Sequence, residues 1–270
     1  EINGVDKYLQ SFADKIDAIE SIKVKQENEG IKIKYIFTYS FSEDFKNELI
    51  KTNIIDAITI LIISIFFLIE TINIIDTLIK EKKKTKFNPI STRALSFLLF
   101  MSYYISVFFV PIQMINLIEN YKLNISKELL VGLPTSIEAL MVAIVAVVSG
   151  IIVDKKGWKP VYIMGNIIMI LGFILSFLSI HPYLFIIARA VSGIGYGASL
   201  SCLRTYVAYA PEKEISTGIA SVNAAAYSSV NIGSIVGGFI GQFIGIKYVF
   251  ITSIVFVVLS YLFAETMTQN

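Results

Sequence analysis

Long apolar stretches, separated by short polar connections, dominate the chain after its first fifty residues. We place seven of them near residues 55–79, 93–118, 130–153, 160–180, 183–208, 216–243 and 248–266. At a rise of about 1.5 Å per residue, each is long enough to cross a hydrocarbon core about 30 Å thick. The pattern therefore predicts seven transmembrane helices, although charged side chains lower the hydropathy of the fifth.

The N-terminal fifty residues have a different pattern. Apolar residues recur at spacings of three and four from Val5 to Ile19, which predicts a helix over residues 5–29. Residues 31–39 partly alternate between apolar and polar, which predicts a strand. The acids that follow open another helix, which runs into the first apolar stretch. Since such a segment makes a poor core by itself, we interpret it as the C-terminal part of a larger α+β domain.

The composition agrees with a membrane protein. Hydrophobic residues make up 55% of the 270 residues, and the mean hydropathy is +0.69, higher than soluble domains of this length need. Residues 1–53 hold 18 of the 44 charged residues, so we expect them to be solvated. The net charge of +2 gives no indication of nucleic-acid binding. Cys202 is the single cysteine, which excludes a disulfide within the chain, and we interpret it as a packing residue.

Lysines gather in alternate connections between the apolar stretches. The richer set holds Lys80, Lys82, Lys83, Lys84, Lys86, Lys155, Lys156, Lys159, Arg204 and Lys213, and the poorer set holds Lys122, Lys127 and Lys247. By the positive-inside rule the richer connections are cytoplasmic, which leaves residues 1–53 outside the cytoplasm. The chain starts at Glu1 without a signal peptide, so we expect further sequence, including a membrane anchor, before it.

The connection between the third and fourth stretches reads Gly150-Ile-Ile-Val-Asp154-Lys155-Lys156-Gly157-Trp158-Lys159. Gly150 permits close helix packing, and Gly157 permits a tight turn. Asp154 can accept hydrogen bonds from the free N–H groups of the next helix or from nearby lysines. The alternative is an ordinary turn whose lysines reflect topology alone.

This connection resembles the signature of the major facilitator superfamily between its second and third helices, Gly-x-x-x-Asp-Arg/Lys-x-Gly-Arg-Arg/Lys. The match covers Gly150, Asp154, Lys155, Gly157 and Lys159, and the sequence departs from the signature at Trp158. The resemblance implies a latch that closes the cytoplasmic side of a transporter in its outward-open state. Trp158 removes one cation from that latch.

Two glycine-rich segments extend the resemblance. Arg189 followed by a glycine-rich run is similar to the family's fourth-helix motif, and residues 224–241 are similar to its fifth-helix motif, without the Pro often found there. The glycines expected to pack helices are Gly193, Gly195, Gly197, Gly233, Gly237 and Gly241. All three motifs are typical of the first half of such transporters, which implies a second half in the same full-length chain.

In this fold the substrate lies near the bilayer midplane between two six-helix halves. Polar residues inside the stretches are therefore candidates for a substrate or proton path: Tyr103, Tyr104, Gln113, Asn116, Glu138, Arg189 and Asn231. A carboxylate such as Glu138 is costly within a membrane unless it titrates or pairs. Proton coupling and an ion pair with Arg189 are two alternatives, against a water-exposed Glu138 and an Arg189 that snorkels to headgroups. We expect Glu70 and Asp76 to be interfacial.

The predicted fold is an all-α membrane protein. It has an extracytoplasmic α+β segment (1–53), a transmembrane helix (54–80), a basic cytoplasmic linker (81–92) and a six-helix half (93–266). With no nucleophile–base pair, phosphate loop or His/Cys cluster, and with His181 in a turn, we expect no enzyme activity and no cofactor or metal.

The first functional hypothesis is a secondary active transporter of a small solute in the plasma membrane, coupled to H⁺ or Na⁺. The layout of residues 1–53 resembles the membrane-proximal end of a bacterial Cache-type sensor. A receptor that signals through a transporter-like bundle is therefore the main alternative, and a structural membrane anchor is a third.

Overall fold

The computed structural model describes residues 19–29, 32–41, 43–81, 89–119, 121 and 126–267. They belong to two compact units, residues 1–62 and residues 63–270. The predicted helix over residues 5–18 and most of the basic linker, residues 82–88, lie outside the described residues.

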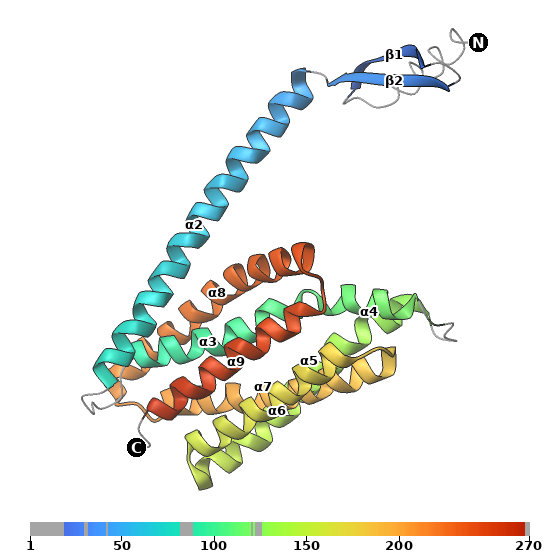
Figure 1. The fold of residues 1–270 in the computed structure, drawn as a ribbon. Coiled ribbons are helices and arrows are strands. Elements are labelled where there is room, and N and C mark those ends of the chain that lie inside the picture. Colours follow the sequence, from blue (N-terminus) through green and yellow to red (C-terminus); the bar gives the residue numbers. More distant parts are fainter. Residues whose placement is uncertain are drawn as a thin grey trace. The chain divides into compact units, whose positions relative to one another are not determined.

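The first unit contains an antiparallel pair of strands, β1 (Ile19–Glu29) and β2 (Lys32–Phe41), followed by the first turns of helix α2 (Glu43–Glu81) (Figure 1). β2 covers the segment for which a strand is predicted. The helix predicted over residues 5–29 is wrong over residues 19–29, where β1 runs instead. The reason is that this segment places β-branched residues between polar ones, at Ile22 and Val24, and such alternation suits a strand.

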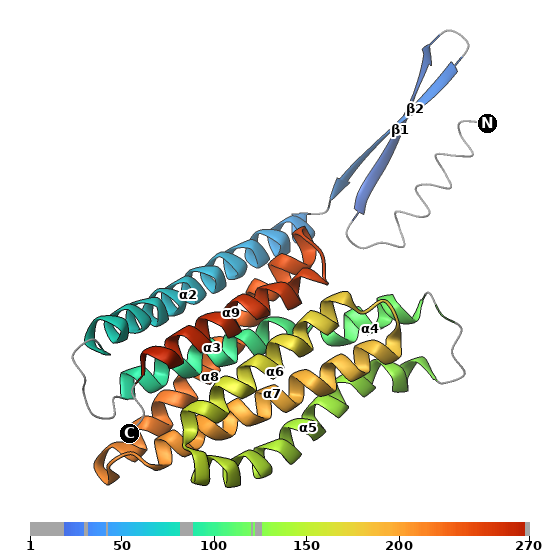
Figure 2. The ribbon, with the colours of Figure 1, turned by 60° about the horizontal axis from the view of Figure 1, so that its bottom comes forward.

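The second unit is a helical bundle (Figures 1 and 2). It contains α2 from Ile63 onward, α3 (Pro89–Val107), α4 (Val110–Ile118), α5 (Lys127–Lys156), α6 (Trp158–Leu178), α7 (Pro182–Ala208), α8 (Glu212–Phe243) and α9 (Tyr248–Thr266). α3 and α4 cover one predicted stretch, broken at Phe108 and Phe109. The break lies just before Pro111, whose ring has no place in the interior of a helix.

Within the described residues, five segments are long and apolar enough to cross a membrane. They are Ser91–Ile118, Lys127–Lys156, Trp158–Leu178, Pro182–Ala208 and Tyr248–Thr266. Each coincides with a predicted stretch. α2 and α8 are helical through the other two stretches but are not among the five, so the total of seven spans remains a prediction.

The helix contacts repeat between two parts of the bundle. α3 packs along α8 and α9, and α7 packs in the same way along α5 and α6, while α6 and α9 contact each other. Exchanging α3/α4 with α7, α5 with α8 and α6 with α9 reproduces the whole contact pattern. The bundle therefore consists of two similarly arranged groups of helices (Figure 2). In one group α3 contacts α8 and α9, and in the other α7 contacts α5 and α6.

Glycines allow the closest of these contacts. A Cβ atom added to Gly193 would lie 2.5 Å from the carbonyl oxygen of Glu138, and one added to Gly197 would lie 2.8 Å from that of Val142. Gly195 meets the backbone of α6, and Gly233 and Gly237 meet the backbone of α3. Gly241 differs, because a Cβ there would make only ordinary contacts, the nearest to the Phe109 ring at 3.5 Å.

Candidate functional site

A buried ion pair joins α5 to α7. Arg189 Nη2 donates to Glu138 Oε1 at 2.5 Å, and the same oxygen accepts from Ser192 Oγ at 2.8 Å. All three residues are fully buried. The two helices come this close because Gly193, on α7, packs against the backbone of Glu138. The structure thus contains the pair rather than a water-exposed Glu138 or a snorkelling Arg189.

The surroundings of the pair are mostly apolar. The guanidinium carbon of Arg189 lies 5.5 Å from the ring centroid of Phe173 and 5.8 Å from that of Phe250, within the range of cation–π attraction. Glu138 Oε2 and Arg189 Nε and Nη1 have no hydrogen-bond partner in the described part of the chain. The cluster is therefore a buried charge pair that leaves several polar atoms without a partner among the described residues.

Aromatic side chains of α3 lie against α7 and α8. Tyr103 stacks on Tyr196 with ring centroids 4.1 Å apart and planes 3° apart, and Tyr104 meets Tyr103 edge to face at 5.4 Å. The Cβ of Tyr104 lies at Gly233 of α8. Tyr104 thus sits at the α3–α8 contact.

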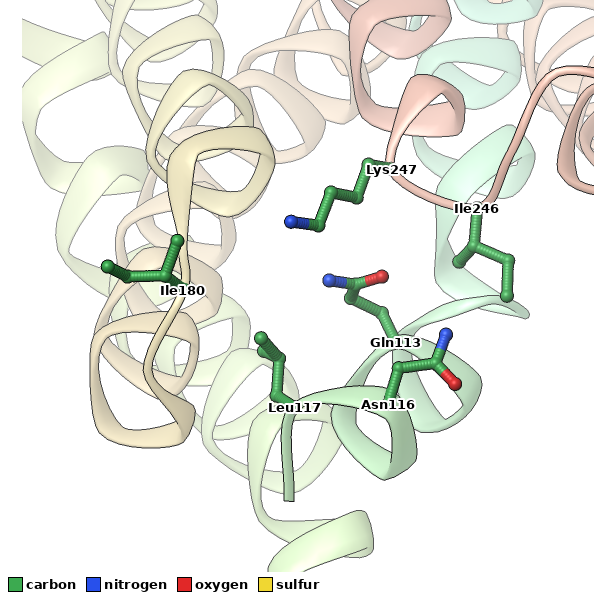
Figure 3. A pocket seen from close by; sticks show the side chains of 6 residues that line it. All are labelled: Gln113, Asn116, Leu117, Ile180, Ile246 and Lys247. Atoms are coloured by element: carbon green, nitrogen blue, oxygen red, sulfur yellow. The ribbon is translucent and has the colours of Figure 1, made fainter. Parts of the chain in front are cut away.

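The remaining path candidates lie in two other places. Gln113 and Asn116, on α4, line a pocket of about 370 Å³ (Figure 3). Asn231 lies on an exposed face of α8, where its amide nitrogen donates to the Tyr227 carbonyl oxygen at 2.8 Å. The seven candidate residues of the path are therefore distributed over several places within this bundle.

The connection between α5 and α6 is tied to two other helices. Gly157 makes the turn with a φ of 81°, in the region that favours glycine. The Tyr209 hydroxyl, at the end of α7, donates to Asp154 Oδ1 at 2.9 Å. Lys159 Nζ donates to the carbonyl oxygens of Glu265 and Met267, both at 3.0 Å, and so caps the end of α9. Asp154 thus binds the tyrosine that follows α7, and within the described residues no hydrogen bond joins it to the start of α6 or to a lysine.

The other residues of this connection also have distinct settings. Lys155 is exposed, and Gly150 approaches Ser201 of α7. Trp158 is buried, with its ring centroid 4.7 Å from that of Tyr206. Trp158, where the sequence departs from the family signature, therefore does more than remove a cation. Its indole ring also packs the turn against α7.

The Asp154 carboxylate raises the pKa of Tyr209 above its ordinary value. The hydrogen bond favours the protonated hydroxyl, and the negative charge disfavours the phenolate. Since the pKa is raised in the folded state, the contact stabilises the fold at neutral pH, and the stabilisation is lost as the pH rises through the raised value. Tyr209 is exposed to solvent, so the gain in free energy is small.

A second buried carboxylate escaped the sequence reasoning. Glu70 of α2 is fully buried among the helices rather than exposed to water, while its interfacial depth in a membrane stays a prediction. Arg93 donates to it from Nη2 at 2.6 Å and from Nε at 3.1 Å, and Ser228 of α8 donates at 3.0 Å. The available signal was an acid within an apolar run of α2 and an arginine at the start of the next apolar stretch.

The described residues contain no group of three or more His, Cys, Asp or Glu side chains that could hold a metal ion. His181 Nδ1 accepts from the Tyr183 N–H at 3.3 Å and caps the start of α7. Cys202 is buried in the packing of the same helix.

Comparison with known proteins gives the family. The model of the Major Facilitator Superfamily matches residues 94–268. The multi-drug resistance efflux pump PmrA, in two strains of Streptococcus pneumoniae, is 26% identical over 122 residues, which are 44% of this chain and 30% of the relative. The matched segment thus spans less than a third of that pump. With several helices apolar enough to cross a bilayer, the chain is a multi-pass membrane protein, and it belongs to the Major Facilitator Superfamily, whose members are transporters of small solutes and not enzymes.

Proposed function

We propose that the chain supplies the first of two six-helix halves of a secondary active transporter, which moves a small solute by alternating access. The observation that carries the proposal is a polar stripe on α8. Asn223, Tyr227 and Asn231 lie four residues apart and are all exposed, Tyr227 by 74%. Carboxamides facing hydrocarbon are costly. This face therefore suits a water-filled path beside a second half better than it suits lipid.

The face of α5 supports the same arrangement by contrast. Its exposed residues include Leu140, Ile144, Val147 and Ile151, each at least half exposed. They share one side of the helix and carry no polar group. An apolar face of this kind fits lipid or close packing against a second half, so we assign the aqueous path to α8 and not to α5.

Coupling to H⁺ is favoured over coupling to Na⁺. The buried cluster holds one carboxylate, Glu138, and one guanidinium, Arg189. Protonation of Glu138 would break the pair and free Arg189 for another partner. A Na⁺ ion would be repelled by the same arginine.

We assign a latch role to the α5–α6 connection. Its contacts with Tyr209 and with the end of α9 hold three helix ends together. Asp154, Lys155, Gly150, Gly157 and Lys159 would then stabilise the state that is closed to the cytoplasm. In the proposed topology the lysine-rich connections lie in the cytoplasm and residues 1–53 lie outside it.

The N-terminal unit favours a second candidate function. A strand pair followed by a helix that continues into the bundle is a layout suited to a Cache-like sensor. The alternative is thus a receptor in which the bundle transmits a signal from ligand binding outside the cell. It predicts a ligand response without net movement of solute.

Thiol labelling of α8 tests the path. In a Cys202→Ser background, Asn231→Cys in the full-length protein should react with a water-soluble, membrane-impermeant maleimide, and Val255→Cys on the exposed side of α9 should not. If Val255→Cys is labelled and Asn231→Cys is not, α8 faces lipid and the proposal is wrong.

A dye assay separates the transporter from the receptor. Because the relative is called a multi-drug resistance efflux pump, ethidium is a suitable first probe. Energised cells that express the full-length protein should lose ethidium faster than cells that do not express it. An aqueous α8 face without movement of ethidium or other organic cations would favour the receptor or a different solute.

A further inference from the structure

A separate pocket lies where three segments of the bundle meet. It has a volume of about 370 Å³ and is lined by Gln113, Asn116 and Leu117 of α4, Ile180 of the α6–α7 connection, and Ile246 and Lys247 of the α8–α9 connection (Figure 3). Pockets that hold small organic molecules have volumes of about 300–1,000 Å³. The pocket shares no residue with the Glu138–Arg189 cluster or with the polar stripe of α8.

Gln113 presents an unused donor to this pocket. Its side chain is 1% exposed, and its amide nitrogen has no hydrogen-bond partner among the described residues. A buried amide N–H without an acceptor is unfavourable, so an acceptor atom from a ligand or from water is expected beside it.

Lys247 supplies the charge. Its side chain extends over the pocket, with the ammonium on the same side as the amide nitrogen of Gln113 (Figure 3). Among the described residues that line the pocket, Lys247 is the only charged one, so no carboxylate competes for it. An ammonium beside an amide N–H is a donor pair that suits an oxyanion and repels a cation.

Apart from Asn116, whose carboxamide also lines the pocket, the other walls are apolar. Leu117, Ile180 and Ile246 are arranged around the two donors (Figure 3). From the donor pair and these walls we infer that the pocket binds an organic anion, with its carboxylate or phosphate on Gln113 and Lys247 and its hydrocarbon part on the apolar residues. A free amphiphilic acid and the headgroup of an anionic lipid share this chemistry.

Titration with hexanoate tests the site for a free anion. With the full-length protein in phosphatidylcholine nanodiscs, calorimetry should show saturable binding beyond the partitioning into empty nanodiscs. Lys247→Gln and Gln113→Met should each weaken it by about tenfold or more. Lys156→Gln, at an exposed lysine of the α5–α6 connection, is the matched control and should leave it unchanged. Hexylammonium, which has the same chain and the opposite charge, should not bind saturably.

A lipid arm distinguishes the two sources. If the occupant is a lipid headgroup, phosphatidylglycerol in the nanodisc should compete with hexanoate, and native mass spectrometry should find this lipid on the wild type and less of it on Lys247→Gln. The inference is overturned if the wild type binds neither probe, if hexylammonium binds as well as hexanoate, or if Lys247→Gln leaves binding of both probes unchanged. Because Lys247 is exposed, its variant decides the matter even if Gln113→Met does not fold.

Discussion

At the scale of single residues, the buried charges of Glu138 and Arg189 depend on each other. Each is fully buried, and the Arg189 guanidinium has one carboxylate partner, Glu138, among the described residues. A buried ion pair adds little net stability because desolvation offsets the attraction. Losing one partner is different, since it leaves the other charge buried and unpaired.

Glu138→Gln should therefore lower the free energy of unfolding by about 3–5 kcal/mol. Arg189→Met should do the same, and the double variant should recover most of the loss. Unfolding can be followed through the thiol of Cys202, which is buried in the fold and becomes reactive when the helices separate. Glu128→Gln, at an exposed acid on the same helix, is the control. Additive losses in the double variant would contradict the pairing.

The glycine contacts lead to a second prediction at this scale. Gly193→Ala places a methyl group 2.5 Å from the Glu138 carbonyl oxygen, so α5 and α7 must separate. Overpacking of this kind costs about 1–3 kcal/mol, and it should also move Arg189 relative to Glu138. Gly132→Ala is the matched control on α5, because a Cβ there meets nothing within 4 Å. Equal thermal stability of the two variants would mean that the helices are not in close contact at Gly193.

Single residues also show which parts of the candidate site can be predicted from the sequence alone. Glu138 and Arg189 are recognisable because a charge inside an apolar stretch requires a partner. Glu70 is the same kind of residue, but its partners Arg93 and Ser228 lie 23 and 158 positions away in other helices. Its burial therefore follows from packing between elements, about which hydropathy carries no information. Tyr209 escaped for a related reason, since an exposed tyrosine at a helix end has no pattern that marks it.

At the scale of elements, long apolar stretches predict well where helices form. They predict poorly where a helix is interrupted. The turn at Gly157 follows from a glycine among charges, whereas the break at Phe108 and Phe109 interrupts a continuous apolar run. For β1, the spacing of three between Ile19 and Ile22 suits a helix and the spacing of two between Ile22 and Val24 suits a strand. The residues pair with β2, as a strand.

The contact of α2 with the bundle gives a prediction about a whole helix. Glu70 joins α2 to Arg93 of α3 and Ser228 of α8. Arg93→Met leaves the Glu70 carboxylate buried with a single neutral donor, so residues 63–81 should separate from α3 and α8. Hydrogen exchange of the amides in the C-terminal turns of α2 should become faster, while α9 keeps its protection. Arg204→Met, at an exposed arginine of α7, should change neither.

The α5–α6 connection gives another prediction at the scale of elements. Tyr209→Phe removes only the hydroxyl that binds Asp154, so it should reproduce the effect of Asp154→Asn. If the connection is a latch, both variants should impair transport of the same probe to a similar degree, with normal insertion into the membrane. Tyr248→Phe, at an exposed tyrosine that begins α9, is the control. Unchanged transport in both Asp154→Asn and Tyr209→Phe would assign the contact a purely structural role.

At the scale of the whole molecule, α9 extends from the pocket lined by Lys247 to the α5–α6 connection. Lys247 immediately precedes α9 and lines the anion pocket, whereas Lys159 binds the carbonyl oxygens at the end of α9. A helix of 19 residues is about 28 Å long, close to the hydrocarbon thickness of a bilayer. The pocket and the α5–α6 connection therefore lie at opposite ends of the bundle.

Sidedness follows from this separation and can be measured. In a Cys202→Ser background, Lys247→Cys should react with an impermeant maleimide added outside intact cells, and Lys156→Cys should react only after permeabilisation. Because α2 makes one further crossing in the proposed topology, Lys32→Cys in the N-terminal unit should behave like Lys247→Cys. Reaction of Lys32→Cys and Lys156→Cys from the same side would mean that α2 does not cross the bilayer as proposed. A sensor domain outside the cytoplasm would then be excluded, whereas the six-helix half would stand, because its assignment rests on residues 94–268.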